Sequence, residues 1–267
     1  MKNQPPIVTL MTDFGTDDVY VGVMKGVIAA IAPRARAIDL THAIPPFAVV
    51  QAAFRLKQAY PYFPEGTIHV TVVDPGVGSS RRAVAMESDG HVFIAPDNGL
   101  LSPIEREHGR TQLVALTNDA FFRKPVSATF HGRDIFAPVA AHIANGVALS
   151  ELGPPLDALE LLACPRAVLG DNGIVRGEVL WADRFGNLVT NIPGTLLSGR
   201  RVVAVRVGDK TIDGLSATFT DVAEGALLAT IGSFGMLEIA LRRGSAAGEL
   251  AAGPGTVVQA RPEKGTV

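Results

Sequence analysis

The sequence has very little cysteine and almost no net charge. Cys164 is the only cysteine among 267 residues, so the chain can form neither an internal disulfide nor a cysteine-based metal site. This favours a reducing compartment, and we expect a cytoplasmic protein. Lysine and arginine (24) nearly balance aspartate and glutamate (26), so there is no basic field to release counterions from nucleic acid. We therefore expect no nucleic-acid partner.

Long apolar runs are also missing. The N-terminal stretch MKNQPPIVTL has no apolar segment long enough for a signal peptide or a membrane span, and we expect no membrane partner. Apolar residues make up 47% of the chain and charged residues 19%, which is typical of a globular protein. The length allows one large domain or two smaller ones.

Strands and helices alternate over about the first 150 residues. IVTLMTD, ARAIDLTH and TIHVTVVDPGVG predict buried strands, and DDVYVGVMKGVIAAIAP and FAVVQAAFRLKQAYPYFP have helical spacing. HVFIAPDNGLLSPI and DIFAPVAAHIANG continue the pattern. This alternation predicts an α/β domain with a mostly parallel sheet and helices on both faces. Ligands of such sheets bind beyond the carboxyl ends of the strands, where the Asp-rich and Gly-rich turns fall.

Prolines and glycines interrupt this pattern between residues 153 and 172. The later segments GIVRGEVLWAD, NLVTNIP, RVVAVRVGDKTI and GALLATIG are short alternating runs separated by turns. They predict a smaller antiparallel β domain or barrel. We therefore expect an N-terminal α/β domain at 1–160, a linker at about 161–171 and a C-terminal β domain at 172–267.

Two polar clusters lie at predicted strand ends. In TDFGTDD, the carboxylates of Asp13, Asp17 and Asp18 could cap the following helix, bind a ribose or an amine, or hold a divalent cation. In VVDPGVGSSRR, Asp74 follows an apolar run and needs a partner, which Arg81 or the adjacent arginine can supply. That ion pair could brace the turn or orient groups in an active site. No helix-forming segment follows the glycines, which disfavours a phosphate site.

Two further stretches carry candidate residues. A lone histidine such as His131 in TFHGRDIF is more often structural than catalytic, and the Arg-Asp pair after it is expected to support the turn. In WADRFGNLVTNIP, the amide of Asn187 suits an adenine edge and Phe185 could stack on the ring. The same Asp, Gly and Asn residues are also typical of a turn between two strands.

Six motifs in order resemble the S-adenosyl-L-methionine (SAM) hydroxide adenosyltransferase family, the SAM hydrolases related to the SAM-dependent fluorinase and chlorinase. These are MTDFGTDD, VVDPGVGSSRR, APDNGLLS, TFHGRDIFAPVAAHIA, DRFGNLVTNI and GSFGMLEIA. They extend from about residue 7 to 258. Because they are spread over both expected domains, together they are far more specific than any one of them.

The resemblance implies that SAM and water are converted to adenosine and L-methionine, with SAM as substrate, no cofactor and no metal. It implies a catalytic set of Asp74, Arg81 and His131. It also implies substrate contacts from Asp13 to the ribose, Asn187 to the adenine edge, Phe185 and Phe219 to the adenine faces, and Asp17, Asp183 and Ser233 to the methionine end. Family members are expected to be homotrimers whose site lies between the N-terminal domain of one subunit and the C-terminal domain of the next.

The resemblance favours water over halide as the nucleophile. Asp74 and His131 stand where the halogenases have aromatic hydroxyl residues, and the extra loop of the fluorinase is missing after PDNG. The halogenases also place an arginine after the serine that matches Ser233, whereas Phe234 follows here, so an arginine clamp on the methionine carboxylate is in doubt. The alternatives are a chlorinase-like halogenase and a non-catalytic adenosine or SAM-binding module, with a metallohydrolase using the Asp13 cluster a distant fourth.

The chemistry itself requires few catalytic groups. A sulfonium leaves as a neutral thioether, so no general acid is needed, but water has a pKa of about 15.7 and is a poor nucleophile. Neutral His131 is the expected acceptor of the water proton. Arg81 is expected to fix the water and Asp74, because it cannot act as a base. Asp74 is expected to select the tautomer of His131 or to accept the water proton itself.

Overall fold

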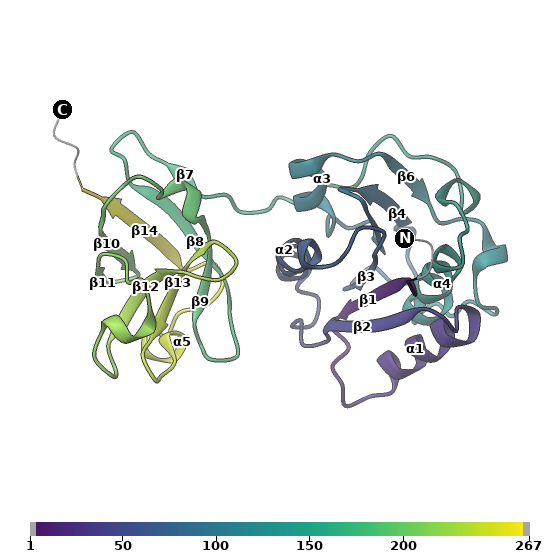
Figure 1. Ribbon diagram of the computed structural model, residues 1–267, viewed down its shortest axis with the longest axis horizontal. Coiled ribbons are helices and arrows are strands. Elements are labelled where there is room, and N and C mark those ends of the chain that lie inside the picture. Colours follow the sequence, from purple (N-terminus) through teal and green to yellow (C-terminus); the bar gives the residue numbers. More distant parts are fainter. Residues whose placement is uncertain (1–3, 264–267) are drawn as a thin grey trace. The chain divides into compact units, whose positions relative to one another are not determined.

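The computed structural model describes residues 4–263 and forms two compact units. The first unit ends at Ala163 and the second begins at Cys164 (Figure 1). No helix within residues 4–263 is long and apolar enough to cross a membrane.

The first unit contains a six-stranded sheet in the order β2-β1-β3-β5-β4-β6. Strands β2, β1, β3 and β5 are parallel, whereas β4 is antiparallel to both of its neighbours. This confirms the predicted mostly parallel sheet. The strand bounds are β1 Ile7–Thr12, β2 Arg36–Thr41, β3 Ile68–Val72, β4 Ala83–Ser88, β5 His91–Pro96 and β6 Gln112–Ala115.

Helices cover both faces of this sheet, as predicted (Figure 1). Leu10 of β1 packs in one core with Met24 and Ile28, whereas the next residue, Met11, packs in the opposite core with Leu56. This alternation follows from the period of two in a strand, which sends successive side chains to opposite faces. The first face carries α1 (Tyr20–Ile31) and α4 (Ala137–Ala144), and the second carries α2 (Val49–Ala59) and α3 (Ser102–His108).

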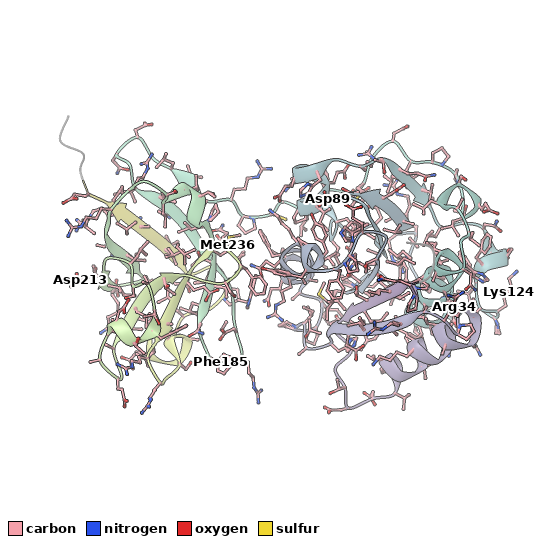
Figure 2. All side chains as sticks on the ribbon, viewed as in Figure 1. Arg34, Asp89, Lys124, Phe185, Asp213 and Met236 are labelled. Carbon is pink, nitrogen blue, oxygen red and sulfur yellow. The ribbon has the colours of Figure 1, made fainter. Side chains whose placement is uncertain are left out.

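The antiparallel strand β4 is absent from the sequence predictions. It forms a hairpin with β5 through Asp89 and Gly90, whose φ angles are +49° and +74° (Asp89 is labelled in Figure 2). An Asp-Gly pair favours two consecutive positive φ angles and is a strong short-range hairpin signal. The Asp-Gly dipeptide in MESDGHVF therefore indicates the hairpin between β4 and β5, which the pattern of apolar residues alone does not predict.

The second unit is a nearly closed antiparallel barrel, which confirms the predicted β domain. Its strands follow the order β11-β10-β14-β8-β9-β13-β12, and β11 and β12, at the two ends of this order, contact each other. Short strand β7 pairs with β8, and α5 follows β13 in the chain. The bounds are β7 Val168–Leu169, β8 Val175–Ala182, β9 Leu188–Pro193, β10 Val202–Val207, β11 Lys210–Asp213, β12 Leu227–Ile231, β13 Met236–Leu241, α5 Ala246–Glu249 and β14 Val257–Pro262.

A chain of buried polar side chains crosses the sheet of the first unit. Thr9 Oγ1 lies 2.8 Å from His69 Nδ1, and His69 Nε2 lies 3.3 Å from His91 Nδ1. His69 is fully buried and stacks on Phe93. Burial lowers the pKa of His69 to about 3, and repulsion from His91 acts in the same direction. The folded protein therefore keeps His69 neutral.

We predict that the protein loses stability as the pH falls from about 6.5 towards 3. His69 has a lower pKa in the folded state than in the unfolded state, so its contribution is complete above pH 6.5 and is lost on acidification. Urea unfolding of the wild type and of His69→Gln at pH 7 and pH 5 measures the effect. The variant should lose less stability between the two pH values, and an equal loss would contradict the assignment.

Candidate active site

Two candidate carboxylates leave the sheet at the same edge. Strands β1 and β3 are parallel neighbours, with Thr12 opposite Val72. Asp13 follows the last residue of β1, and Asp74 lies two residues beyond the end of β3. The carboxyl ends of parallel strands therefore bring the TDFG and DPGVG loops to one edge, where sheets of this class bind ligands.

Asp74 forms an ion pair with Arg81, not with Arg82. Arg81 Nε donates hydrogen bonds to Asp74 Oδ1 at 2.9 Å and Oδ2 at 3.0 Å, and Arg81 Nη2 also donates to Oδ2. The two side chains are only 11% and 5% exposed. Arg82 turns the other way and pairs with Asp97 at the end of β5, with Nε 2.8 Å from Oδ2. Burial of a carboxylate is stabilising only when it is paired, and Arg81 supplies that pair.

Arg81 also contacts His131, which completes a chain of three side chains. Arg81 Nη2 lies 2.7 Å from His131 Nδ1. A guanidinium can only donate, so Nδ1 accepts and the proton of the neutral ring is on Nε2. Arg81, rather than Asp74, therefore sets the tautomer, which corrects the expectation from the sequence. Burial, followed by the charge of Arg81, lowers the pKa of His131 against the opposing effect of Asp74 and Asp134.

The segment after His131 holds it in place. Residues Gly132–Phe136 form a π-helical turn that leads into α4, a local irregularity often found at functional sites. Buried Asp134 accepts hydrogen bonds from Arg133 Nε at 2.6 Å and Arg133 Nη2 at 2.8 Å, which confirms the predicted supporting pair. A Cβ on Gly132 would lie 3.1 Å from Met24 Sδ, so this close packing favours glycine.

The loop after β1 packs against the residue that precedes His131. The Phe14 ring lies 5.9 Å from the Phe130 ring, centroid to centroid, and Phe130 also contacts Tyr20. Asp13 Oδ2 accepts a hydrogen bond from the Phe47 backbone N–H at 2.9 Å. Aromatic packing thus couples the Asp13 loop to the Asp74–Arg81–His131 chain within the first unit.

The helix-capping interpretation of the TDFGTDD carboxylates is wrong. Helix α1 begins at Tyr20 after Val19, no side chain caps it, and no acidic residue lies in its first turn. Asp17 is exposed and makes no hydrogen bond with any residue in 4–263. Within the same residues, no group of three or more His, Cys, Asp or Glu side chains is arranged to hold a metal ion.

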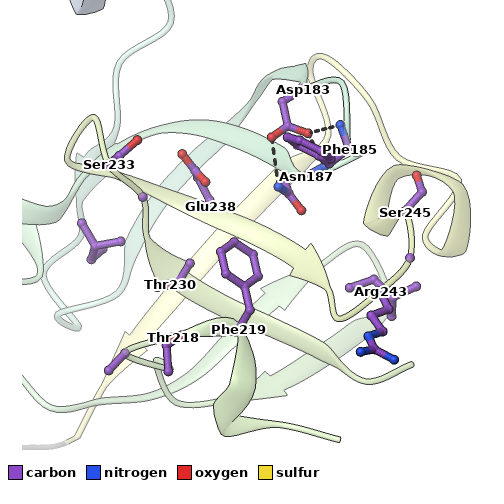
Figure 3. A pocket seen from close by; sticks show the side chains of 15 residues that line it. Asp183, Phe185, Asn187, Thr218, Phe219, Thr230, Ser233, Glu238, Arg243 and Ser245 are labelled. Atoms are coloured by element: carbon purple, nitrogen blue, oxygen red, sulfur yellow. Dashed lines mark hydrogen bonds between the residues drawn. The ribbon is translucent and has the colours of Figure 1, made fainter. Parts of the chain in front are cut away.

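The second unit contains a pocket of about 880 Å³ that gathers the remaining candidates (Figure 3). Phe185 and Phe219 line it and are 76% and 46% exposed. Asn187 is buried beside them, whereas Asn191, from the same sequence stretch, bonds the Glu178 backbone N–H and does not line the pocket. Five residues that the sequence analysis named as substrate contacts line the pocket: Asp183, Phe185, Asn187, Phe219 and Ser233.

Asp183 builds the turn that presents Phe185 and Asn187. Its Oδ1 accepts hydrogen bonds from the backbone N–H groups of Phe185 at 2.8 Å and Asn187 at 2.9 Å, and its Oδ2 accepts from Asn187 Nδ2 at 2.9 Å (dashed lines in Figure 3). The turn interpretation is thus confirmed. The amide oxygen of Asn187 accepts no hydrogen bond from residues 4–263, so it is available to a ligand.

Glu238 of β13 is a pocket residue that the sequence analysis missed. Its neighbours Leu237 and Ile239 point into the barrel core, so Glu238 occupies an outward position. An outward glutamate in an alternating strand normally indicates solvent exposure. No sequence pattern indicated that Glu238 lines a pocket. The turn at Asp183–Asn187 and the segment around Phe219, which border the pocket, are remote from Glu238 in sequence.

Comparison with known proteins places the chain in a family. Models of the SAM hydroxide adenosyltransferase N-terminal and C-terminal domains match residues 8–153 and 177–259. The chain belongs to the SAM hydroxide adenosyltransferase family. It is 40% identical over 259 residues to an (R)-S-adenosyl-L-methionine hydrolase of Salinispora tropica, covering 94% of this chain and 95% of that protein.

Two further relatives define the range of the SAM hydroxide adenosyltransferase family. A fluorinase of Nocardia brasiliensis is 30% identical over 280 residues, covering 91% of this chain and 92% of that protein. The crystal structure of an uncharacterized conserved protein from Thermotoga maritima superposes with a TM-score of 0.90 at 41% identity, covering 95% of this chain and 99% of that one. The family relation to fluorinases is thus confirmed.

We predict that Arg81→Ala raises the pKa of His131. The variant removes both the nearby positive charge and the donor to Nδ1, and it leaves the Asp74 carboxylate to favour the imidazolium. An NMR titration of the His131 ring, assigned with His131→Gln, measures the change. Arg82→Ala is the matched control because Arg82 pairs with Asp97, and equal pKa values in both variants would contradict the assigned contact.

Proposed function

We propose that this protein hydrolyses SAM to adenosine and L-methionine at the Asp74–Arg81–His131 chain. The observation that carries the proposal is the continuous series of hydrogen bonds from Asp74 through Arg81 to His131. The protein that contains this series is 40% identical to a SAM hydrolase. The chain is an enzyme of this class. The more distant 30% identity to a fluorinase supports the hydrolase branch.

The reaction is a displacement at the ribose C5′ atom. A bond forms between the water oxygen and C5′, the bond between C5′ and the sulfonium sulfur breaks, and sulfur keeps the electron pair as a neutral thioether. One water proton is released, so the products are adenosine, L-methionine and a proton. The protein must therefore position water and provide an acceptor for this proton.

The tautomer of His131 assigns different roles to the catalytic side chains. Nδ1 is engaged by Arg81 and Nε2 carries a proton, so the neutral ring donates a hydrogen bond and orients the water. Asp74 is therefore the acceptor in this proposal, in place of His131, which the sequence analysis expected in that role. A carboxylate has about four lone-pair sites, and Arg81 makes three hydrogen bonds to it, so one site is left for water. Arg81 holds both partners and takes no proton itself.

The other candidates bind the substrate in this proposal. Asp13 uses Oδ2 for the Phe47 N–H, keeps Oδ1 free of hydrogen bonds from described residues, and holds the ribose hydroxyls. Phe185 and Phe219 contact the faces of adenine, and the amide oxygen of Asn187 accepts from its edge. Asp17, Asp183 and Ser233 are assigned to the methionine end. Turnover thus requires both units of the chain.

We also propose that the protein is a cytoplasmic homotrimer, as the resemblance to the family implies. Closed symmetric oligomers are common among soluble enzymes. Sedimentation equilibrium should give the mass of three chains, and the mass of one chain at assay concentration would contradict the proposal.

A product assay with and without halide tests the function. Incubation of the purified protein with SAM should give equal amounts of adenosine and methionine, and added chloride or fluoride should not change the products. Formation of 5′-halo-5′-deoxyadenosine would instead support a halogenase. Binding of SAM with no product above the uncatalysed background would support a binding module.

We predict that Asp74→Asn lowers kcat by about 10²- to 10⁴-fold, with a smaller effect on KM, because the variant removes the proton acceptor. Asp97→Asn is a matched control, since Asp97 forms the corresponding ion pair with Arg82 at the end of β5, the neighbour of β3 in the sheet. Both variants are assayed below their unfolding temperatures. Full activity of Asp74→Asn would show that the Asp74–Arg81 pair only braces the turn.

A further inference from the structure

We propose that Thr12 and His42 are positioning residues that hold the Asp13 carboxylate where it can bind the ribose hydroxyls. Neither side chain contacts the substrate in this proposal, and both act through the loop that carries Asp13. The inference rests on the proposed hydrolase function, in which Asp13 holds the ribose, and it adds two residues that determine the position of that carboxylate.

An irregularity in the pairing of β1 with β2 brings His42 to the end of β1 (Figure 1). The register shifts between Leu10 and Met11, where β2 contains one extra residue. A bulge of this kind changes the direction of the side chains next to it. Beyond the shift, Met11 pairs with Thr41. Thr12 and His42, which follow these two residues in the chain, therefore come together.

Thr12 and His42 are buried polar residues that contact each other. Thr12 is fully buried, His42 is 5% exposed, and Thr12 Oγ1 lies 2.8 Å from His42 Nδ1. His42 Nε2 lies 3.0 Å from Asp39 Oδ1, and Asp39 also pairs with Lys25. Because a carboxylate only accepts, the proton of the neutral ring is on Nε2, and Nδ1 accepts from the Thr12 hydroxyl. The Asp39 carboxylate thus sets the orientation of the Thr12 hydroxyl through His42.

The same two residues hold the backbone of the Asp13 loop. Thr12 Oγ1 accepts a hydrogen bond from the Phe14 N–H at 3.2 Å, and the His42 carbonyl accepts one from the Gly15 N–H at 2.9 Å. Asp13 therefore lies between a buried strand end and two amide groups whose positions are fixed. With the backbone held in this way, Oδ2 of Asp13 accepts its one backbone N–H, and Oδ1 stays free of hydrogen bonds from described residues.

A second threonine–histidine pair in the same strand provides an internal comparison. Thr9 is also buried in β1, and its Oγ1 lies 2.8 Å from His69 Nδ1 on β3. The Thr9 hydroxyl lies three residues before Thr12 and makes no hydrogen bond with residues 13–15. Each pair buries one hydroxyl against one imidazole, but only Thr12 also bonds the loop. Comparing the two threonines separates an effect on the loop from an effect on stability alone.

Thr12→Val removes the hydroxyl and keeps nearly the same side-chain shape. Calorimetry with the full-length chain compares adenosine with 2′,3′-dideoxyadenosine, which lacks both ribose hydroxyls that Asp13 would hold. Thr12→Val should weaken adenosine binding by about 10-fold, because a hydrogen bond to a charged group is disturbed. Binding of the dideoxy compound should be unchanged. KM for SAM should rise in the same proportion, with a smaller change in kcat.

Three further variants complete the set. Thr12→Ser retains the hydroxyl and should restore adenosine affinity. His42→Gln lacks the ring nitrogen that accepts from Thr12, so it should change the two affinities in the same direction as Thr12→Val. Thr9→Val is the matched control and should bind both nucleosides as the wild type does.

A double-mutant cycle with Asp13→Ala tests the route of the effect. In the Asp13→Ala background, Thr12→Val should not weaken adenosine binding further. The proposal is overturned if Thr12→Val leaves adenosine affinity unchanged, if it weakens both nucleosides equally, or if its effect persists without the Asp13 carboxylate. A wild type that binds adenosine but does not hydrolyse SAM would refute the proposed function and would still allow each of these comparisons.

Discussion

A single guanidinium, that of Arg81, donates hydrogen bonds to a buried carboxylate on one side and to an imidazole nitrogen on the other. Without it, Asp74 would be a buried and unpaired charge, and His131 could place its proton on either nitrogen. Because arginine stays protonated and only donates, both partners must be acceptors towards it. This constraint fixes a neutral ring with its N–H on Nε2, and it is the reason that we propose Asp74 as the acceptor of the water proton.

The fold supplies the positions that this arrangement needs. Parallel pairing of β1 and β3 brings Asp13 and Asp74 to one edge of the sheet, and the π-helical turn before α4 carries His131 to the same ion pair. The barrel contributes a different chemistry. It offers two aromatic rings, an amide and the carboxylate of Glu238, which suit recognition rather than proton transfer. In the proposed function, chemistry at C5′ is thus assigned to the first unit, whereas recognition of SAM is shared between the barrel and the Asp13 loop of the first unit.

Much of the architecture follows from periodicity, but particular contacts do not. The alternation of apolar runs predicted the parallel sheet and the barrel, whereas β4 was missed because the Asp89-Gly90 turn was not interpreted as a hairpin. Spacing could not decide between Arg81 and Arg82, since a change of one residue reverses the direction of a side chain. The resemblance to the family selected Arg81, and the structure shows its two partners.

The errors have physical causes as well. The carboxylates of TDFGTDD have the composition of a helix cap, but α1 begins only at Tyr20, beyond their reach. Asp74 was expected to select the tautomer of His131 or to accept the water proton, and the first alternative fails because Arg81 lies between the two side chains. Glu238 had the pattern of a solvated strand position, and only the tertiary fold encloses it in a pocket.

In the proposed reaction, water held by Asp74 and His131 attacks C5′ of SAM. Turnover in water enriched in the heavy oxygen isotope, followed by mass spectrometry of the products, tests it most directly. We expect one heavy oxygen in the 5′-hydroxyl of adenosine and none in methionine. Unlabelled adenosine, or label in methionine, would contradict it.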